Sequence, residues 1–431
     1  MSGVAVAIHL LRRGGPGLEL VVVERDGQRA LGRGIAYGVE SRVFRLNVPA
    51  SKMSLDPEHP EDFVTWAQLT ERATPTAFLP RTVYGAYVEE RFAEAVRESR
   101  ASLRVVRGRA VSVDDEGVTL EDGTRLLADD VVLATGLSPA ATDVDRDRHR
   151  EVNAWDERAL ATLPRAGRLL ILGAGLTALD ALAFLDAHGF TGHVTVVSRR
   201  ALLPRPHLSP LRPASPLSAQ PMTRLPEGLR PLIAWVRAVV RETEARGEPW
   251  QLAIDSVRPH IPALWRRLSP GDRARFVRSV RPYWDVLRHR APVDALALVD
   301  AWRNAGRLEL LAGSMVRCTS TGGALDIELR LAGGTRARGT YDALVRCTGP
   351  ALVRGDADDP LVRSLIASGR AMEDPAGLGL VTDDDGRVVP PDGATAPRIF
   401  ALGALRRASA WDTTSVPEIS VQALALARLM L

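Results

Sequence analysis

The chain has few cysteines and no long apolar run. Only Cys318 and Cys347 occur among its 431 residues, far apart and without a CxxC pair, so we expect neither a redox-active disulfide nor a bound metal. No run of 18 uncharged apolar residues is present, which argues against a membrane span. The apolar stretch 4–11 is followed by basic residues and not by a cleavage site, so we expect no signal peptide and a cytoplasmic protein.

Lysine is almost absent as well. Lys52 is the only lysine among the 56 basic residues, and the net charge is +4 with a pI near 9.5. Because the 52 acidic residues are well mixed with the basic ones, the charge forms no basic stripe of the kind that binds nucleic acid. We therefore expect a small-molecule substrate as partner, with no nucleic acid and no membrane. Homo-oligomerisation is left open.

The length exceeds that of one ordinary core and predicts two or three domains. A hydrophobic content of 45% and a charged content of 25% are typical of a globular protein.

A glycine-rich motif lies in the middle of the chain, at residues 168–180. The apolar run 169–172 predicts a buried strand, Gly173 and Gly175 a tight turn, and the following residues a helix that packs closely through Ala178. Such a turn lets backbone N–H groups approach a pyrophosphate at the positive end of the helix. We place Gly173, Gly175 and Thr177 in a dinucleotide site; the alternative is a tight turn that binds nothing.

The second strand of this unit, at 193–197, indicates which nicotinamide cofactor is used. An NAD site usually has an acidic residue after this strand, for the ribose 2′-hydroxyl. Here Ser198, Arg199 and Arg200 follow, and an arginine fork matches the geometry of a 2′-phosphate. The sequence thus favours NADPH; the alternative is a solvated arginine pair on a loop.

The start of the chain resembles a second such unit that lacks its first strand and first two glycines. Gly3 leads into a predicted helix at 4–13, and a predicted strand at 18–24 ends on Glu24 and Arg25. An acid at this place would bind the adenosine ribose of a dinucleotide. Either the start codon is assigned too late or the protein is truncated, and we favour the first because the rest of the unit keeps the pattern.

Several further segments carry a family resemblance. They are the segments 32–37 (Gly-Arg-Gly-Ile-Ala-Tyr), 46–50 (Leu-Asn-Val-Pro-Ala), 281–290, 346–350 and 411–418. With both nucleotide units located, the chain resembles the FAD/NAD(P)-binding proteins related to flavin-containing monooxygenases and N-hydroxylases. The resemblance spans nearly the whole length.

The resemblance implies roles for individual residues. Gly3, Glu24 and Arg25 would serve the adenosine diphosphate of FAD, while Gly34, Tyr37 and Asn47 would lie along the flavin. The remaining implied contacts are Thr135, Gly136 and Gly349 at backbone crossings, Gly403 near the ribityl chain, and Val416 and Pro417 at the start of the last helix, beside the flavin ring. Ala404 stands where many relatives have an acidic residue.

The predicted fold class is α/β with two Rossmann-like domains. The FAD domain comprises 1–165 and 341–431, and the NADPH domain 166–340, with a helical insertion at about 204–300. The expected activity is hydride transfer from NADPH to FAD followed by oxygen activation, as in a monooxygenase. The alternatives are a reductase or dehydrogenase without oxygenation, and a degenerate nucleotide-binding protein. No catalytic side chain is predicted, since His207 and His289 are interpreted as structural.

Overall fold

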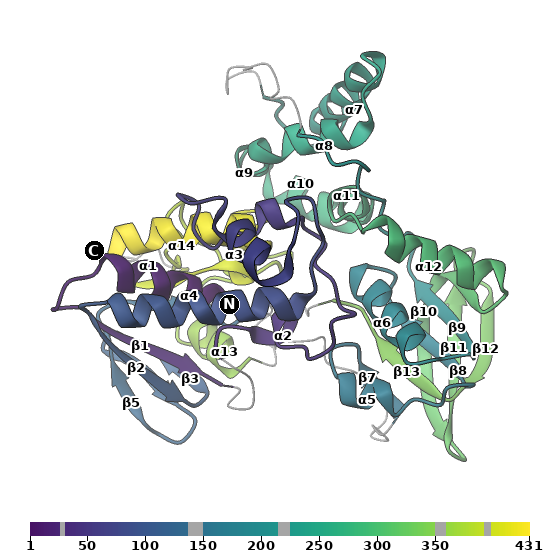
Figure 1. The fold of residues 1–431 in the computed structure, drawn as a ribbon, viewed down its shortest axis with the longest axis horizontal. Helices are drawn as coiled ribbons and strands as arrows, with labels where there is room; N and C mark the ends of the chain where they lie inside the picture. Colours follow the sequence, from purple (N-terminus) through teal and green to yellow (C-terminus); the bar gives the residue numbers. More distant parts are fainter. Residues whose placement is uncertain (26–30, 137–149, 214–224, 350–358, 392–397) are drawn as a thin grey trace.

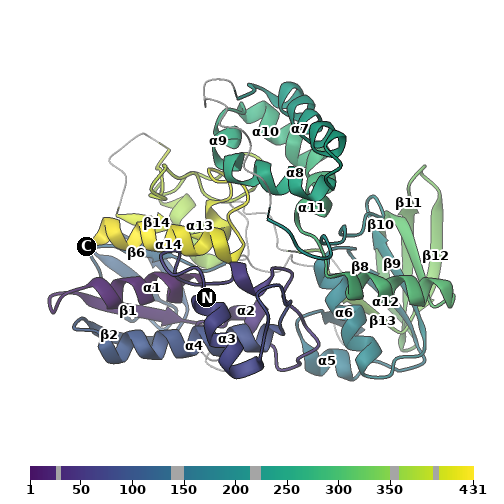
Figure 2. The same ribbon diagram turned by 45° about the horizontal axis from the view of Figure 1, so that its top comes forward.

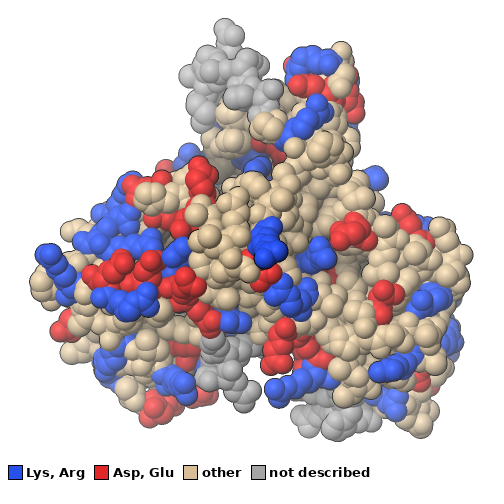
Figure 3. Space-filling model, viewed as in Figure 1, with Lys and Arg blue, Asp and Glu red and all other residues tan. Residues whose placement is uncertain are grey.

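The computed structural model describes residues 1–25, 31–136, 150–213, 225–349, 359–391 and 398–431. Two α/β lobes lie side by side, and a group of helices projects on one side between them (Figure 1). Among the described helices, none is long and apolar enough to cross a membrane. On the face drawn in Figure 3, basic side chains are interspersed with acidic ones.

The first lobe is built from both ends of the chain. Its strands β1 (Glu19–Glu24) and β2 (Ser102–Arg107) pair in parallel, as do β6 (Val131–Leu133) and β14 (Ile399–Ala401). β2 thus pairs with a strand that lies far before it in the chain, and not with the strand that follows it. The antiparallel sheet consists of β3 (Ala110–Val113), β4 (Gly117–Leu120) and β5 (Arg125–Leu127).

Helices form the core of this lobe. α1 (Ser2–Arg13) is buried on all sides from Val4 to Leu11, because its apolar residues face both its sheet and the neighbouring helices. The other helices of the lobe are α2 (Gly34–Tyr37), α3 (Asp62–Glu71), α4 (Arg81–Glu98), α13 (Pro360–Ala367) and α14 (Val416–Met430), with the 3₁₀ turns η1 (Ala50–Lys52) and η6 (Gly403–Arg406). α1, α4 and α14 run alongside one another (Figure 1).

The second lobe contains one seven-stranded sheet of order β12-β11-β10-β9-β8-β13-β7. The strands from β10 to β7 are parallel, and β11 and β12 add an antiparallel edge. Their bounds are β7 (Glu151–Asn153), β8 (Arg168–Leu172), β9 (His193–Ser198), β10 (Leu308–Thr321), β11 (Ala324–Leu331), β12 (Arg336–Tyr341) and β13 (Ala343–Arg346). Leu169, Leu170 and Ile171 of β8 are fully buried, as expected for a central parallel strand.

This sheet extends past the predicted limits of the NADPH domain. β7 lies before residue 166 and β13 after residue 340, yet both belong to the sheet of β8. The helices of this lobe are α5 (Glu157–Ala161), α6 (Leu176–Ala187) and α12 (Val293–Asn304). The division into domains remains a prediction.

Between β9 and α12 the chain forms a helical segment, which Figure 2 shows as one group. It contains α7 (Leu229–Ala245), α8 (Trp250–Val257), η4 (Arg258–His260), α9 (Ile261–Arg266), α10 (Pro270–Arg275), the π-helical turn η5 (Phe276–Val280) and α11 (Arg281–Arg288). Trp265 is buried in it, stacks at 4.9 Å on Trp411, and donates a hydrogen bond from Nε1 to the Ala408 carbonyl (2.8 Å). This contact joins the helical segment to the loop before α14.

Candidate nucleotide sites

The turn between β8 and α6 has the geometry that the glycine motif predicts. Gly173 has a φ of +110°, and a Cβ atom there would lie 2.3 Å from the carbonyl oxygen of Cys347. Its N–H donates to the Val197 carbonyl (2.8 Å), which fixes the turn against β9. Ala178 is 1% exposed, in agreement with the close packing that was expected at this position. Only glycine fits at 173.

The start of α6 is open. Gly175 precedes the helix, and a Cβ atom there would meet nothing within 4 Å. Thr177 lies in the first turn of the same helix. The first N–H groups of a helix have no partner within the helix, so this end can receive an anion.

The predicted 2′-phosphate residues lie at the same edge of the sheet, because β8 and β9 are parallel neighbours. Ser198 ends β9. Arg199 is exposed, and no hydrogen bond or ion pair joins its side chain to the residues that the structure describes. Arg200 reaches the helical segment: its Nη2 donates to the Arg278 carbonyl (3.4 Å), and its guanidinium carbon lies 5.7 Å from the ring centre of Tyr283.

In the first lobe, several predicted residues converge on the start of α1. A Cβ atom on Gly3 would lie 3.2 Å from Ala134 Cβ, directly before Thr135 and Gly136. A Cβ on Gly403 would lie 3.5 Å from Ser2 Oγ, and one on Gly34 would lie 3.8 Å from the Met1 nitrogen. Thus α2 and the carboxyl ends of β6 and β14 meet at this helix end.

The glycines of this group also have backbones suited to a turn. Gly34, Gly136 and Gly403 have φ values of +57°, +72° and +66°. A Cβ on Gly136 would meet nothing within 4 Å, so the backbone is accessible there. Gly349, which was predicted as the second crossing, likewise has a positive φ (+76°) and open space where a Cβ would lie.

Glu24 is the last residue of β1. Burial lowers the pKa of the Met1 amino group to about 6, and the negative charge of Glu24 acts in the opposite direction. Arg25 follows Glu24 and is exposed.

Tyr37, at the end of α2, and Asn47 are the other two residues that were predicted to lie along the flavin. Tyr37 packs at 4.7 Å on Tyr84, and burial raises the pKa of its phenol while the charge of Arg81 lowers it. The carbonyl of Asn47 accepts a hydrogen bond from His207 Nε2 (2.9 Å). Arg81 Nη2 in turn lies 2.9 Å from Asp180 Oδ2 of α6, so an ion pair joins the two lobes.

The start of α14 is surrounded by charged side chains that the sequence analysis did not identify. Val416 and Pro417 begin the last helix, as predicted, and Val416 is buried. Arg288 Nε lies 2.5 Å from Asp412 Oδ2, and both side chains are buried. Glu418 bonds to Ser415 and to Arg258.

Sequence reasoning could have found only part of this cluster. The spacing of Ser415 and Glu418 is that of a capping box, a recognisable local signal. The arginines Arg258 and Arg288 come from the helical segment, and no local pattern predicts their partners.

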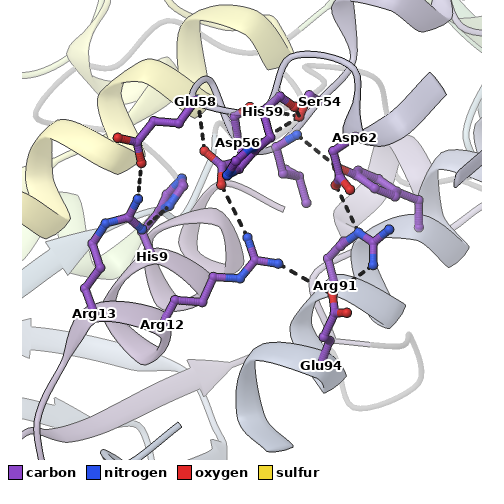
Figure 4. A network of polar contacts seen from close by, with 12 residues as sticks. His9, Arg12, Arg13, Ser54, Asp56, Glu58, His59, Asp62, Arg91 and Glu94 are labelled. Atoms are coloured by element: carbon purple, nitrogen blue, oxygen red, sulfur yellow. Dashed lines mark hydrogen bonds and ion pairs between the residues drawn. The ribbon is translucent and has the colours of Figure 1, made fainter. Parts of the chain in front are cut away.

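The sequence also did not predict a second network of charged side chains, which lies at the end of α1 (Figure 4). Arg12 Nη1 lies 3.4 Å from Asp56 Oδ2 and its Nη2 lies 3.5 Å from Glu94 Oε2, while Arg91 Nε lies 2.9 Å from Asp62 Oδ2. These side chains line an open cavity of about 620 Å³. The network joins the last turn of α1 to α4 and to the loop after η1, and so holds α1 in position.

The sequence predicts no catalytic side chain, and His289 was interpreted as structural. His289 is 3.7 Å from Asp412, and burial lowers the pKa of its imidazole. Within the described ranges, no cluster of three or more His, Cys, Asp or Glu could hold a metal ion.

Comparisons with known proteins agree with this architecture. Residues 1–138 match the family model described as FAD-NAD(P)-binding. No curated protein matches the chain in sequence.

Solved structures match over the whole length. The ornithine N-hydroxylase of Kutzneria sp. 744 superposes with a TM-score of 0.66 at 14% identity, covering 100% of this chain and 96% of that one. The L-lysine 6-monooxygenase of Pseudomonas syringae gives 0.64 at 16% identity, with coverages of 100% and 96%. Thioredoxin reductase of Lactococcus lactis gives 0.53 at 11% identity, with coverages of 99% and 94%. The predicted fold class is confirmed: the chain has the two-lobed α/β fold of dinucleotide-binding flavoproteins.

Proposed function

We propose that the chain is an FAD-dependent, NADPH-using oxidoreductase that acts as a monooxygenase on a small molecule in the cytoplasm. The observation that supports this most is the turn at Gly173 and Gly175. Only glycine fits at 173, where the backbone approaches Cys347 closely, and the start of α6 at Gly175 is unobstructed. Arg199 lies at the same edge of the sheet without a partner among the described residues.

The residues present fit both cofactors. Gly173, Gly175 and Thr177 would hold the pyrophosphate of NADPH, with Ser198, Arg199 and Arg200 at its 2′-phosphate. The start of α1, with Gly34, Gly136 and Gly403 around it, would hold the diphosphate of FAD. Glu24 would accept hydrogen bonds from the ribose hydroxyls there.

Bound FAD supplies the electron transfer and the oxygen chemistry, and the protein supplies position and charge. The N–H groups at the start of α14 favour negative charge on a neighbouring ring. Arg258 and Arg288 add positive charge there, and Glu418 and Asp412 balance it. This arrangement leaves the helix end itself as the main source of positive potential.

Oxygenation is supported by the solved structures with the same fold. These structures are of an ornithine N-hydroxylase, an L-lysine 6-monooxygenase and a cadaverine monooxygenase. Each acts on a small amine, so we propose a small molecule with a nucleophilic nitrogen as the substrate class.

A reductase that passes electrons to another acceptor is the second candidate, because thioredoxin reductase shares the fold. The thiol–disulfide form of this activity has no support in the cysteines. Cys318 and Cys347 are both buried, and burial raises the pKa of both thiols, so neither is a ready nucleophile.

The visible spectrum of the purified protein, before and after anaerobic NADPH, tests the proposal. A flavin band that bleaches with NADPH supports the transfer between the two sites. A protein without flavin, or with flavin that NADPH cannot reduce, would instead be a degenerate nucleotide-binding protein. Readmission of oxygen with candidate amines then separates the two enzymes: a monooxygenase yields oxygenated product in proportion to the NADPH consumed, and a reductase does not.

A further inference from the structure

The helical segment contacts the predicted NADPH site at one point. Arg200 follows β9, and its guanidinium group lies over the ring of Tyr283, which belongs to α11. Its Nη2 also donates to the carbonyl of Arg278. An arginine expected to meet a phosphate is therefore positioned by residues about 80 positions later in the chain.

Tyr283 is unusual among the five tyrosines of the chain. Its side chain is 52% exposed, whereas Tyr84 and Tyr87 are fully buried and Tyr341 is 5% exposed. A large aromatic ring with one face against a guanidinium and much of its surface in solvent is available to a planar ligand. Aromatic rings bind nucleobases by stacking, largely without regard to the base.

The backbone beside it is also irregular. Residues Phe276–Val280 form a π-helical turn between α10 and α11, and the Arg278 carbonyl that accepts from Arg200 lies in this turn. Such turns occur frequently at functional sites. The Arg278 side chain is exposed and has no hydrogen bond or ion pair with described residues, so it adds positive charge beside Arg200.

We propose that Tyr283 completes the nucleotide site: its ring stacks on the adenine of NADPH while Arg200, held by the ring and by the Arg278 carbonyl, binds the 2′-phosphate. The helical segment is then part of the cofactor site. This inference rests on the proposed use of NADPH and adds a residue that the glycine motif does not predict.

The test is calorimetric binding of 2′,5′-ADP and of 5′-AMP to the purified full-length chain. These probes carry the adenine with and without the 2′-phosphate, and they need no turnover. The variants are Tyr283→Ala, Tyr283→Phe and Arg200→Gln. The control is Val293→Ala, an equally exposed apolar residue at the start of α12.

We expect Tyr283→Ala to weaken both probes about tenfold, because the lost base stacking affects the adenine that they share. Tyr283→Phe should bind like the unaltered protein, since the ring and not the hydroxyl acts. Arg200→Gln should weaken 2′,5′-ADP more than 5′-AMP. Val293→Ala should change neither.

Two results would overturn the inference. If Tyr283→Ala binds both probes normally while Arg200→Gln loses 2′,5′-ADP, the ring has no role and the NADPH proposal stands. If the unaltered protein does not prefer 2′,5′-ADP over 5′-AMP, the use of NADPH fails and the inference fails with it.

Discussion

The carbonyl oxygen of Cys347 lies 2.3 Å from the position that a Cβ atom on Gly173 would occupy. The turn after β8 and the end of β13 therefore approach each other so closely that no residue other than glycine fits at position 173. Gly175, two residues later, has open space at the equivalent position.

Gly173→Ala should destabilise the second lobe. The substitution places a methyl group against the Cys347 carbonyl at a φ of +110°, which costs about 1–3 kcal/mol for the backbone conformation alone. We expect a lower urea midpoint by circular dichroism. Gly189→Ala is the control. Gly189 also has a positive φ (+72°), but no atom lies within 4 Å of its Cβ position, so this variant should lose less stability.

Gly175→Ala should leave stability nearly unchanged and weaken NADP⁺ binding. Its φ of −85° is accessible to alanine, and the added methyl would project into open space at the start of α6, where we propose that the pyrophosphate binds. Isothermal calorimetry with NADP⁺ measures this effect. If Gly175→Ala binds NADP⁺ as tightly as the unaltered protein does, the start of α6 is not the NADP⁺ site.

Arg199→Gln should reduce the preference for NADP⁺ over NAD⁺. A charged hydrogen bond to phosphate contributes about 1.5–3 kcal/mol, which corresponds to roughly 10- to 150-fold in affinity. Affinity for NAD⁺ should hardly change. Arg303→Gln provides the control, because Arg303 is an exposed arginine at the end of α12; a similar loss in that variant would show a general effect of charge.

Arg288→Ala should strongly destabilise the protein. It leaves the buried carboxylate of Asp412 without its nearest cation, and breaking a buried pair costs about 3–5 kcal/mol. Arg266→Ala serves as the comparison. Its pair with Asp384 has a similar distance (2.7 Å) but is exposed, so its loss should be below about 1 kcal/mol in the same urea titration.

His207 should make stability fall as the pH falls from 7 to 5. Burial lowers the pKa of its imidazole from 6.5 to about 4. In this range the unfolded chain takes up a proton and the folded chain does not, so the unfolded state gains stability as the pH drops below 6.5. His207→Gln keeps a donor for the Asn47 carbonyl and removes the titration. The unfolding free energy of the unaltered protein, measured relative to that of His207→Gln, should therefore fall between pH 7 and pH 5. A difference that stays constant over this range would contradict the assignment.

Much of the fold could be predicted from the sequence, because its signals are local. The run 169–172, Gly173 and the helix after Gly175 specify one strand, turn and helix by burial and backbone conformation. The helix at 4–13 and the last helix with Pro417 in its first turn could be predicted for similar reasons. The parallel pairing of β2 with β1 could not be predicted from alternation alone, because alternation does not identify the partner.

The candidate site, like the fold, could be predicted from the sequence only in part. The glycines around the start of α1 are marked in the sequence only by the family resemblance, and the structure brings them together there. Gly34, Gly136 and Gly403 have positive φ values, but their role in cofactor binding remains a prediction. Arg288 with Asp412, Arg81 with Asp180, and Tyr283 with Arg200 were not predicted. These pairs are separated by 83 to 124 residues in the chain, and only the tertiary packing brings them together.

The contacts between the two lobes also restrict how the molecule can move. Arg81 and Asp180 are largely buried, and Phe44, which is fully buried, stacks at 5.5 Å on Phe184 of α6. Domains that share such a core do not separate readily, because opening them would expose both an ion pair and an aromatic stack. A rotation of one lobe against the other would have to break both contacts, so this ion pair and this aromatic stack oppose such a movement.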